Sequence, residues 1–469
     1  MTRTSTLEIA GGARVITPDS LNLITPYVLY EQQDWFEDEI GFLRRLLLPG
    51  QQAIDVGANY GVYTLSIAQA VGPTGAVWAF EPASSTAAFL EQSIAANRFT
   101  QIVLERSALS RECGTAQLTV NDNSELNALV RDGESGGASE TVPLVTLDDC
   151  LQRFGWQQID LLKIDAEGEE ANIIEGGRRF FVELSPLILY EVKAGEEVHL
   201  ELVGKFAALG FDSYRLVPGL DLLVPFDAAA QPDGYLLNLF CCKKDRAELL
   251  SDRGLLLDSS AIAAYKTGNR FEHFLREHRH EYSWDIELTT LPYGAACVRL
   301  WQSTPGAGAE VTDALTCFAI SQDTDLNPLE RFSALESSFM ALMSLCQSAP
   351  RYLRLASLAR VAREYGARTV AVDALGQLFQ KLVGSEPLNP GEPFLAPGKR
   401  FDRIAPRADV KDWFMASVIE EFERLSSYSS FFTGAAARER LELMVSLGYE
   451  SAEMRRRLEL IRARFPTPA

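Results

Sequence analysis

Histidine, basic residues and long apolar runs are scarce in this sequence, and each scarcity argues against a class of function. Only four of the 469 residues are histidine, namely His199, His273, His278 and His280. Three of them fall within Phe271–Tyr282, where a solvated helical face is the simplest interpretation, so no metal site is predicted there. The 44 lysines and arginines face 64 acidic residues, giving a formal net charge of −20. Such a surface repels phosphate backbones and anionic lipids, which argues against nucleic-acid partners and broad membrane contact.

Cysteine usage and the lack of a targeting signal both indicate the cytoplasm. Seven cysteines are scattered along the chain, and only Cys241 and Cys242 are neighbours, inside an apolar run. This pattern favours buried free thiols in a reducing environment. Met1–Gly12 lacks a signal-peptide pattern, and no apolar run approaches the length of a membrane span. We therefore expect a cytoplasmic protein with no membrane span.

The pattern of apolar, polar and turn-forming residues divides the chain into three regions, residues 1–50, 51–245 and 250–469. The first holds two strand-like stretches, Leu7–Ile9 and Tyr27–Tyr30, and then a helical pattern over Asp34–Leu48 that stops at Pro49-Gly50. The third consists of long, mostly amphipathic helical patterns with a proline-rich linker at Glu386–Pro397. Its predicted helices are Leu326–Cys346, Pro350–Tyr365, Arg368–Val383, Val410–Arg424, Ala435–Leu447 and Ser451–Arg464.

The middle region alternates β-rich runs with helical patterns, which is typical of parallel βαβ units. The predicted strands are Gln52–Val56, Ala76–Phe80, Ile102–Arg106, Asp160–Ile164 and Pro186–Val192, with Ser213–Val217 and Tyr235–Cys242 closing the sheet as a hairpin. A polar stretch, Asn121–Thr141, is predicted to be a loop over a site. The fold class is therefore α/β: a Rossmann-like sheet with flanking helices, followed by a mostly α-helical C-terminal domain.

A glycine loop between the first predicted strand of this sheet and the next helix carries the first functional signal. The strand runs into Asp55, Gly57 and Gly61. Glycine is needed where a chain turns sharply or a ligand approaches the backbone, and the helix start offers free N–H groups. A dinucleotide loop would carry a glycine where this chain has Asn59. A carboxylate such as Asp55 repels a diphosphate but attracts an ammonium, so the loop suits an amino-acid zwitterion better than a pyrophosphate.

Further acidic residues end the other predicted strands. Glu81 follows the second strand, where a carboxylate can accept two hydrogen bonds from a ribose diol. After the third strand, the backbone of Ser107 and Ala108 is placed to meet an adenine edge.

The ends of the fourth and fifth strands supply three more carboxylates. Asp165 and Glu167 follow the fourth strand and Glu191 ends the fifth, so all three should face a ligand at the carboxyl edge of the sheet. Glu169 is interpreted as a helix cap. On an ideal strand the Lys163 side chain points to the opposite face from those of its immediate neighbours, so Lys163 is interpreted as peripheral.

These motifs, in this order, resemble the FkbM family of methyltransferases over roughly residues 25–245. The resemblance is carried by Gln33–Glu37, Asp55–Gly61, Phe80–Pro82, Ser107–Ser110, Val145–Asp148 and above all Lys163–Glu169. It implies a class I Rossmann-like methyltransferase fold that uses S-adenosylmethionine to methylate a hydroxyl of a sugar, a polyketide or another small metabolite. The C-terminal half lies outside the resemblance.

The resemblance also implies roles for individual residues. Asp55, Gly57, Asn59 and Gly61 would surround the methionine part of the cofactor, and Glu81 its ribose. Asp165 and Glu167 would lie near the methyl group or the acceptor.

A hydroxyl is a poor nucleophile, so methyl transfer to oxygen calls for a carboxylate base. Asp165 is the first candidate, with Glu167 and Glu191 behind it. A carboxylate-bound Mg²⁺ holding a sugar diol is a further alternative.

Two rival functions are kept open. One is an NAD-dependent oxidoreductase, which Asn59 and the lack of an evident Tyr-x-x-x-Lys motif disfavour. The other is a non-catalytic scaffold with partner-binding helices. The C-terminal helices are expected to mediate homo-oligomerisation or to recognise a larger glycan-like acceptor.

Overall fold

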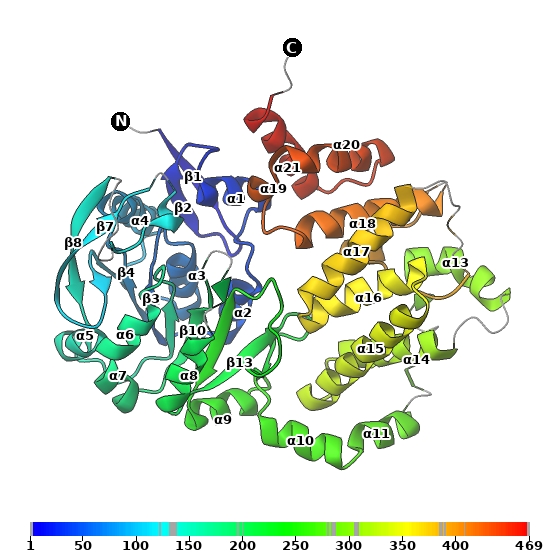
Figure 1. Cartoon of the computed structure of the whole chain (residues 1–469), viewed down its shortest axis with the longest axis horizontal. Coiled ribbons are helices and arrows are strands. Elements are labelled where there is room, and N and C mark those ends of the chain that lie inside the picture. Colours follow the sequence, from blue (N-terminus) through cyan, green and yellow to red (C-terminus); the bar gives the residue numbers. More distant parts are fainter. Residues whose placement is uncertain are drawn as a thin grey trace. The chain divides into compact units, whose positions relative to one another are not determined.

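A computed structural model describes residues 3–121, 123–130, 138–194, 197–198, 200–278, 281–282, 288–303, 309–383, 388, 391–407 and 409–466 of the chain (Figure 1). The chain forms two compact units. The first comprises Met1–Leu216, Pro225–Pro232 and Leu236–Arg253, and the second comprises Val217–Val224, Asp233–Tyr235 and Gly254–Ala469. The first unit ends at Arg253 and the second continues from Gly254, close to residue 250, where the sequence pattern changes. His199, His280 and part of the linker Glu386–Pro397 lie outside the described residues.

The first unit is built on a mixed sheet, whose strands in this unit have the order β13-β15-β10-β9-β3-β4-β5. Their bounds are β3 (Gln52–Val56), β4 (Ala76–Phe80), β5 (Ile102–Glu105), β9 (Leu161–Ile164), β10 (Leu187–Glu191), β13 (Asp212–Val217) and β15 (Asn238–Cys242). The five strands from β10 to β5 are parallel, while β15 runs antiparallel to β10 and β13. The fold class predicted from the sequence is therefore confirmed. The two predicted closing strands pair antiparallel, as β13 with β15, but β14 (Leu222–Pro225) lies between them in the chain, so they do not form the predicted hairpin.

The strand order places a topological switch point between β3 and β9. From β3 the chain moves outward to β4 and β5, and it returns to the other side of β3 with β9 and β10. In open α/β sheets a crevice forms at such a point, outside the carboxyl ends of the strands, and ligands bind there. This position directs attention to the residues that follow β3 and β9.

Helices that alternate with the strands along the chain flank this sheet (Figure 1). They are α2 (Asp38–Leu46), α3 (Val62–Val71), α4 (Ser84–Asn97), α5 (Leu147–Phe154), α6 (Glu170–Gly176), α7 (Arg178–Glu183), α8 (Glu201–Ala208) and α9 (Lys244–Asp252). A main core cluster beneath them contains Ile54, Ile164, Phe180 and Phe206, each with 0% of its surface exposed. Burial of such side chains contributes about 1.5–3 kcal/mol each.

The N-terminal segment differs from expectation. It forms a hairpin of β1 (Thr4–Glu8) and β2 (Arg14–Pro18), and then α1 (Ile24–Gln32). The strand predicted at Tyr27–Tyr30 is wrong, because these residues lie within α1. Tyr27, Val28 and Leu29 are at most 1% exposed, and a short apolar run that is buried on all sides carries no period that separates a helix from a strand.

The polar stretch Asn121–Thr141 is only partly a loop. A small sheet, with strand order β6-β8-β7, stands around it: β6 (Ala108–Leu109), β7 (Gly114–Thr119) and β8 (Ser139–Val145). The turn η1 (Ser124–Leu126) lies between β7 and β8, and residues 122 and 131–137 lie outside the described part. The short strands β11 (Lys193–Ala194) and β12 (Glu197–Val198) pair after β10.

The second unit is helical, as predicted. The predicted helices correspond to α15 (Pro328–Ser348), α16 (Tyr352–Tyr365), α17 (Arg368–Val383), α18 (Val410–Leu425), α20 (Arg438–Leu447) and α21 (Ala452–Arg464). Further elements are β14 (Leu222–Pro225), α10 (Ser259–Thr267), α11 (Arg270–His278), α13 (Pro292–Ser303), α14 (Ala309–Gln322), η2 (Lys399–Arg403), α19 (Ser430–Thr433) and η3 (Gly434–Ala437). Asn327 starts α15 with a reciprocal capping box to Glu330, and Pro328 takes the first helical position.

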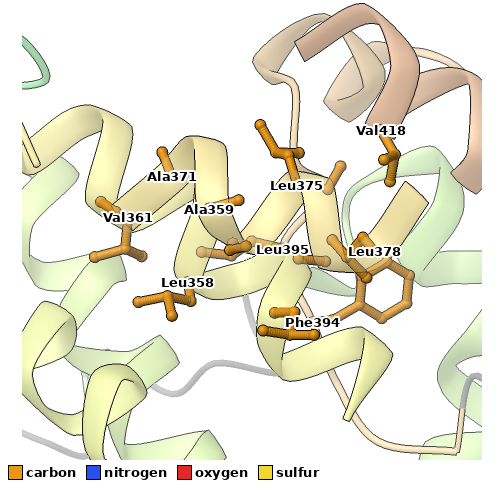
Figure 2. Close-up of a cluster of buried hydrophobic side chains, with 14 of the residues drawn as sticks. Leu358, Ala359, Val361, Ala371, Leu375, Leu378, Phe394, Leu395 and Val418 are labelled. Atoms are coloured by element: carbon orange, nitrogen blue, oxygen red, sulfur yellow. The ribbon is translucent and has the colours of Figure 1, made fainter. Parts of the chain in front are cut away.

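A continuous apolar core holds the second unit together. Figure 2 shows part of this core, with Leu358 and Ala359 of α16, Leu375 and Leu378 of α17 and Val418 of α18 in one cluster of buried side chains. Core positions recur at the helical period in α17, at Ala371, Ala374, Leu375, Leu378 and Leu382. In contrast, α16 and α18 are buried over the continuous runs Leu355–Ala362 and Trp413–Glu421. Among the described residues, no helix combines the length and the apolar character needed to cross a bilayer.

Leu378→Ala should destabilise the second unit by about 2–5 kcal/mol, because Leu378 is 0% exposed and its loss leaves a cavity between α16, α17 and α18. Chemical denaturation followed by circular dichroism measures this change. Met340→Ala is the matched control, since Met340 is 61% exposed and should shift the midpoint little. Equal effects of the two substitutions would contradict the assigned core.

Candidate active site at the carboxyl edge of the sheet

The loop after β3 adopts the conformations that its glycines allow. Gly57, Asn59 and Gly61 have φ values of 76°, 48° and 94°, all in the left-handed region. A Cβ on Gly57 would lie 1.8 Å from the carbonyl oxygen of Asp165. The glycine is thus required by the close approach of the backbone after β9, in addition to the sharp turn that the sequence argument named. The loop and the end of β9 are consequently locked together.

Glu81 organises this loop from the end of β4. Its Oε2 accepts a hydrogen bond from the Asn59 N–H at 2.8 Å, and its Oε1 accepts one from the Ala83 N–H at 2.9 Å. The side chain is mostly buried, and burial raises the pKa of Glu81 to about 7, although the two backbone donors act in the opposite direction. A carboxylate with two fixed oxygens therefore stands at the tip of β4, as the sequence predicts.

Asn59 links the loop to the η1 turn. Its side-chain oxygen accepts hydrogen bonds from the Tyr60 N–H at 2.8 Å and from the Ser124 hydroxyl at 2.9 Å. In the same turn, Glu125 accepts hydrogen bonds from the backbone N–H and the hydroxyl of Thr25, which lies at the start of α1. Sequence reasoning missed Ser124 and Glu125, because the contact joins segments more than 60 residues apart and no local motif marks it.

Lys163 is central to the site, so its interpretation as a peripheral residue is wrong. Its Nζ lies 2.9 Å from Asp165 Oδ2 and 3.7 Å from Asp55 Oδ1, and its side chain is 5% exposed. The error has a geometric cause. Lys163 is in register with Asp55 on the neighbouring parallel strand and two residues before Asp165, and both relations put the side chains on one face of the sheet.

The charge of Lys163 depends on these two carboxylates. Burial acts to lower the pKa of Lys163, but the charges of Asp165 and Asp55 outweigh it and raise the pKa. The ammonium also lies 4.9 Å from the centre of the Tyr63 ring. Lys163 therefore ties the end of β9 to β3 as a cation.

Asp55 is enclosed rather than open to a ligand. It is 0% exposed, its Oδ2 accepts a hydrogen bond from the Thr64 hydroxyl at 2.6 Å, and its Oδ1 lies 3.7 Å from Lys163 Nζ. Burial raises the pKa of Asp55, against the opposing effects of Lys163 and Thr64. In this geometry Asp55 acts on the site through Lys163.

Three predicted carboxyl groups meet at the ends of β9 and β10. Oxygen atoms of Asp165, Glu167 and Glu191 all lie within 4.8 Å of one another. Glu167 has a φ of 48°, and it follows β9 in a turn that Glu170 holds by accepting the N–H groups of Ala166 and Gly168 at 3.0 and 3.2 Å. The expectation that these acids share one edge of the sheet agrees with this geometry.

The three groups differ in their protonation. Burial, followed by repulsion from Asp165, raises the pKa of Glu167 to about 8 and that of Glu191 to about 11. Asp165 has the Lys163 ammonium as its partner. The edge therefore presents Asp165, which is paired with a cation, beside Glu167 and Glu191, which retain their protons to neutral pH or above. Such differences between neighbouring carboxyl groups are typical of acid–base sites.

Neighbouring acids have supporting roles. Glu169 stands at the N-cap position of α6, but its side chain caps no backbone N–H of that helix. It accepts hydrogen bonds from the hydroxyl of Ser110 and the amide of Asn172, both at 2.9 Å. Glu37, which no sequence argument placed in the site, accepts hydrogen bonds from Tyr63 at 2.5 Å, Trp35 at 2.9 Å and Asn238 at 3.0 Å. Burial raises the pKa of Glu37 as well.

Ser107 and Ala108 stand at the start of the small sheet, Ala108 within β6. Both are less than 10% exposed. The Ser107 hydroxyl is buried and finds no hydrogen-bond partner among the described residues. An unmet buried hydroxyl is uncommon, and a bound water molecule or a ligand would complete its bonding.

Comparisons with known proteins identify this part of the chain. Residues 55–213 match the family model for the methyltransferase FkbM domain. The match begins at the end of β3 and covers β9 and β10 together with the loop, Glu81 and the three carboxyls, so the FkbM methyltransferase model matches the segment that carries the candidate site. The resemblance inferred from the motifs is confirmed.

Individual proteins and solved structures are similar to parts of this chain. A curated relative, methyltransferase sdnD of Sordaria araneosa, is 27% identical over 192 residues, which are 34% of this chain and 74% of the relative. Among solved structures, an S-adenosylmethionine-dependent O-methyltransferase from Thermotoga maritima is 15% identical, with a TM-score of 0.26, over 51% of this chain and 77% of its own. An rRNA methylase from Streptococcus thermophilus is 12% identical, with a TM-score of 0.25, over 44% and 93%.

Lys163→Met removes the ammonium while keeping an apolar stem, and it leaves Asp55 without its buried cation. We expect a loss of about 3–5 kcal/mol in the free energy of unfolding at pH 8. The loss should be smaller at pH 5, because burial raises the pKa of Asp55 and a protonated carboxyl needs no cation. Urea unfolding at the two pH values measures the effect.

The double variant Asp55→Asn/Lys163→Met is the control for this prediction. With both charges removed, most of the lost stability should return. Additive losses in the double variant, or a single variant as stable as the wild type at pH 8, would contradict the buried ion pair.

Proposed function

We propose that the first unit transfers a methyl group from S-adenosylmethionine to a hydroxyl of a sugar, a glycan or another small metabolite. The observation that carries this proposal is the meeting of Asp165, Glu167 and Glu191 at the edge that also bears the glycine loop and Glu81. All lie in the segment that matches the methyltransferase FkbM domain. The donor and the oxygen acceptor are the parts of this proposal that go beyond the domain match.

The residues present fit the cofactor. Glu81 offers two fixed oxygens to the ribose hydroxyls, and the unmet hydroxyl of Ser107 together with Ala108 would lie along the adenine. Gly61 begins α3, whose N-terminus no side chain caps among the described residues, so its N–H groups are open to the methionine carboxylate. Asn59 and Gly57 hold that loop in place. Asp55, being enclosed, would contribute through Lys163.

When bound, S-adenosylmethionine supplies an electrophilic methyl group on a sulfonium. The chain must then align the acceptor oxygen, exclude water and accept one proton. Alignment contributes about 7–11 kcal/mol in well-oriented reactions, and a positioned base contributes about 10²–10⁴-fold.

The carboxyl trio divides these tasks. Asp165 is the proposed base, because Lys163 orients it and offsets the repulsion of its neighbours. It would accept the hydroxyl proton as the oxygen forms its new bond to carbon. Glu191 retains its proton at neutral pH and is therefore proposed to donate a hydrogen bond to a second oxygen of the acceptor. Glu167, with a pKa of about 8, is the second candidate for the base.

A divalent cation is the alternative occupant of the same trio. Carboxylate oxygens are the ligands that Mg²⁺ prefers, and the three groups lie close enough to share one ion. Lys163 already supplies a positive charge at Asp165, which favours the metal-free proposal. Activity that survives dialysis against EDTA would support the proposal, and activity restored only by Mg²⁺ would favour the alternative.

The helical unit is proposed to recognise the acceptor, with self-association as its alternative role. A scaffold without catalysis remains the rival for the whole chain, and the intact trio and ribose carboxylate speak against it. Release of S-adenosylhomocysteine in the presence of a panel of hexoses, oligosaccharides and hydroxylated metabolites separates the two.

Glu81→Ala should weaken binding of S-adenosylhomocysteine about 10- to 100-fold, because two hydrogen bonds to a charged acceptor are lost. Isothermal titration calorimetry at pH 8 measures the affinity. The wild-type affinity should itself fall below about pH 7, where Glu81 takes up a proton and loses one acceptor position. Glu112→Ala, an exposed acid of the same unit, is the control. An unchanged affinity in Glu81→Ala would remove the ribose role.

Asp165→Asn should lower turnover about 10²–10⁴-fold while leaving S-adenosylhomocysteine affinity little changed, because the amide keeps the shape but accepts no proton. The S-adenosylhomocysteine release assay gives turnover, and calorimetry gives binding. Asp149→Asn, on the exposed first turn of α5, should change neither. Full turnover in Asp165→Asn would transfer the base role to another carboxyl.

A further inference from the structure

A groove of about 530 Å³ lies on the second unit, along the outer side of α17. Its lining includes Asp373, Gly376, Gln377, Gln380, Lys381 and Phe422. All but Phe422 belong to α17, and Phe422 comes from α18. The groove is therefore a feature of the helical unit alone.

The outer face of α17 is chemically distinct from its inner face. Leu375 and Leu378 point into the apolar core that Figure 2 shows. Asp373, Gln377 and Gln380 follow one another at helical spacing on the opposite stripe and are exposed. Within the described part of the chain, none of these three side chains has a hydrogen bond to another protein group. Their donors and acceptors are open to a ligand.

Gly376 keeps the floor of the groove bare. Glycine inside a helix is less favourable than alanine by about 0.5–1 kcal/mol. A Cβ at this position would meet only the Phe422 ring, at 3.8 Å, which is an ordinary contact. The packing of the unit therefore does not require glycine here, and its effect is to leave the helix backbone uncovered at the floor of the groove.

Phe422 forms a fixed aromatic wall opposite this floor. The Arg440 guanidinium lies 5.3 Å from the centre of its ring and is itself paired with Glu423. Phe422 also packs against the core cluster of the unit. A ring held in this way presents an apolar surface at little cost in side-chain entropy.

We propose that this groove binds a neutral oligosaccharide. Primary amides such as Gln377 and Gln380 both donate to and accept from hydroxyl groups, and the phenyl ring of Phe422 suits the C–H face of a sugar ring. The charges of Asp373 and Lys381 offset each other, which disfavours a strongly charged ligand. An apolar helix from a partner would bury the two amides unpaired.

This inference rests on the proposed function in one respect, since it identifies where the helical unit recognises a glycan acceptor. Its test needs no methyl transfer. The labelled full-length chain is applied to an array of neutral gluco-, manno- and galacto-oligosaccharides and of anionic glycans. We expect retention on neutral oligosaccharides, and titration calorimetry with the retained sugar then gives its affinity.

Gly376→Leu should weaken that affinity about tenfold or more, because the side chain fills the groove. Gly204→Leu is the matched control, since Gly204 also lies in a helix, α8, with open space where a Cβ would stand. Both variants should gain about 1–4 °C in Tm from the loss of a helical glycine, so misfolding is separable from lost binding. Gln377→Ala/Gln380→Ala should also weaken binding.

Three outcomes would overturn the inference: no glycan retained, retention only on anionic glycans, or equal affinity in Gly376→Leu and Gly204→Leu. S-adenosylhomocysteine binding measured on the same samples keeps the two proposals apart. Sugar binding without cofactor binding would support the groove and contradict the proposed function, and the reverse result would do the opposite.

Discussion

The buried ammonium of Lys163 is the interaction on which the arrangement of the carboxyl edge depends. It lies between Asp55 on β3 and Asp165 after β9, so it joins the two strands that flank the topological switch point. Several acids gather here in a setting of low polarity, where like charges drive one another to protonate. The Lys163 cation, with Asp55 and Asp165 as its partners, limits this tendency to protonate at these two carboxyl groups. The same edge can therefore hold a paired carboxyl at Asp165 and protonated neighbours at Glu191 and, below about pH 8, Glu167.

The backbone reinforces this electrostatic constraint. Gly57 admits the carbonyl of Asp165 at a distance that no side chain would allow, and Glu81 fixes Asn59 from the next strand. The loop of the proposed cofactor site and the turn that carries Asp165, the proposed base, are thus joined at one edge of the sheet. Such preorganisation is what methyl transfer requires, because little of the chemistry is done by the protein beyond alignment and one proton transfer.

Much of this could be predicted from the sequence. The β3 and β4 strands begin and end where the pattern places them, at Gln52–Val56 and Ala76–Phe80, because a buried parallel strand is an apolar run bounded by turn residues. The gathering of Asp165, Glu167 and Glu191 followed from the rule that parallel strands end at one edge. What failed needed tertiary information: the helix at Tyr27–Tyr30 is buried on all sides, and the partners of Lys163 include an in-register residue on another strand. Glu37 lies in the motif Gln33–Glu37, to which the sequence argument gave no role in the site, and Ser124 reaches the site from a distant segment without a motif.

The most direct measurement is a crystal structure of the full chain grown with S-adenosylhomocysteine. The account predicts that the ribose hydroxyls lie within hydrogen-bond distance of the Glu81 carboxylate, that the sulfur faces Asp165, and that Lys163 stays between Asp55 and Asp165. A ligand bound away from this edge, or a Lys163 side chain turned out of its ion pair to contact the ligand, would contradict it.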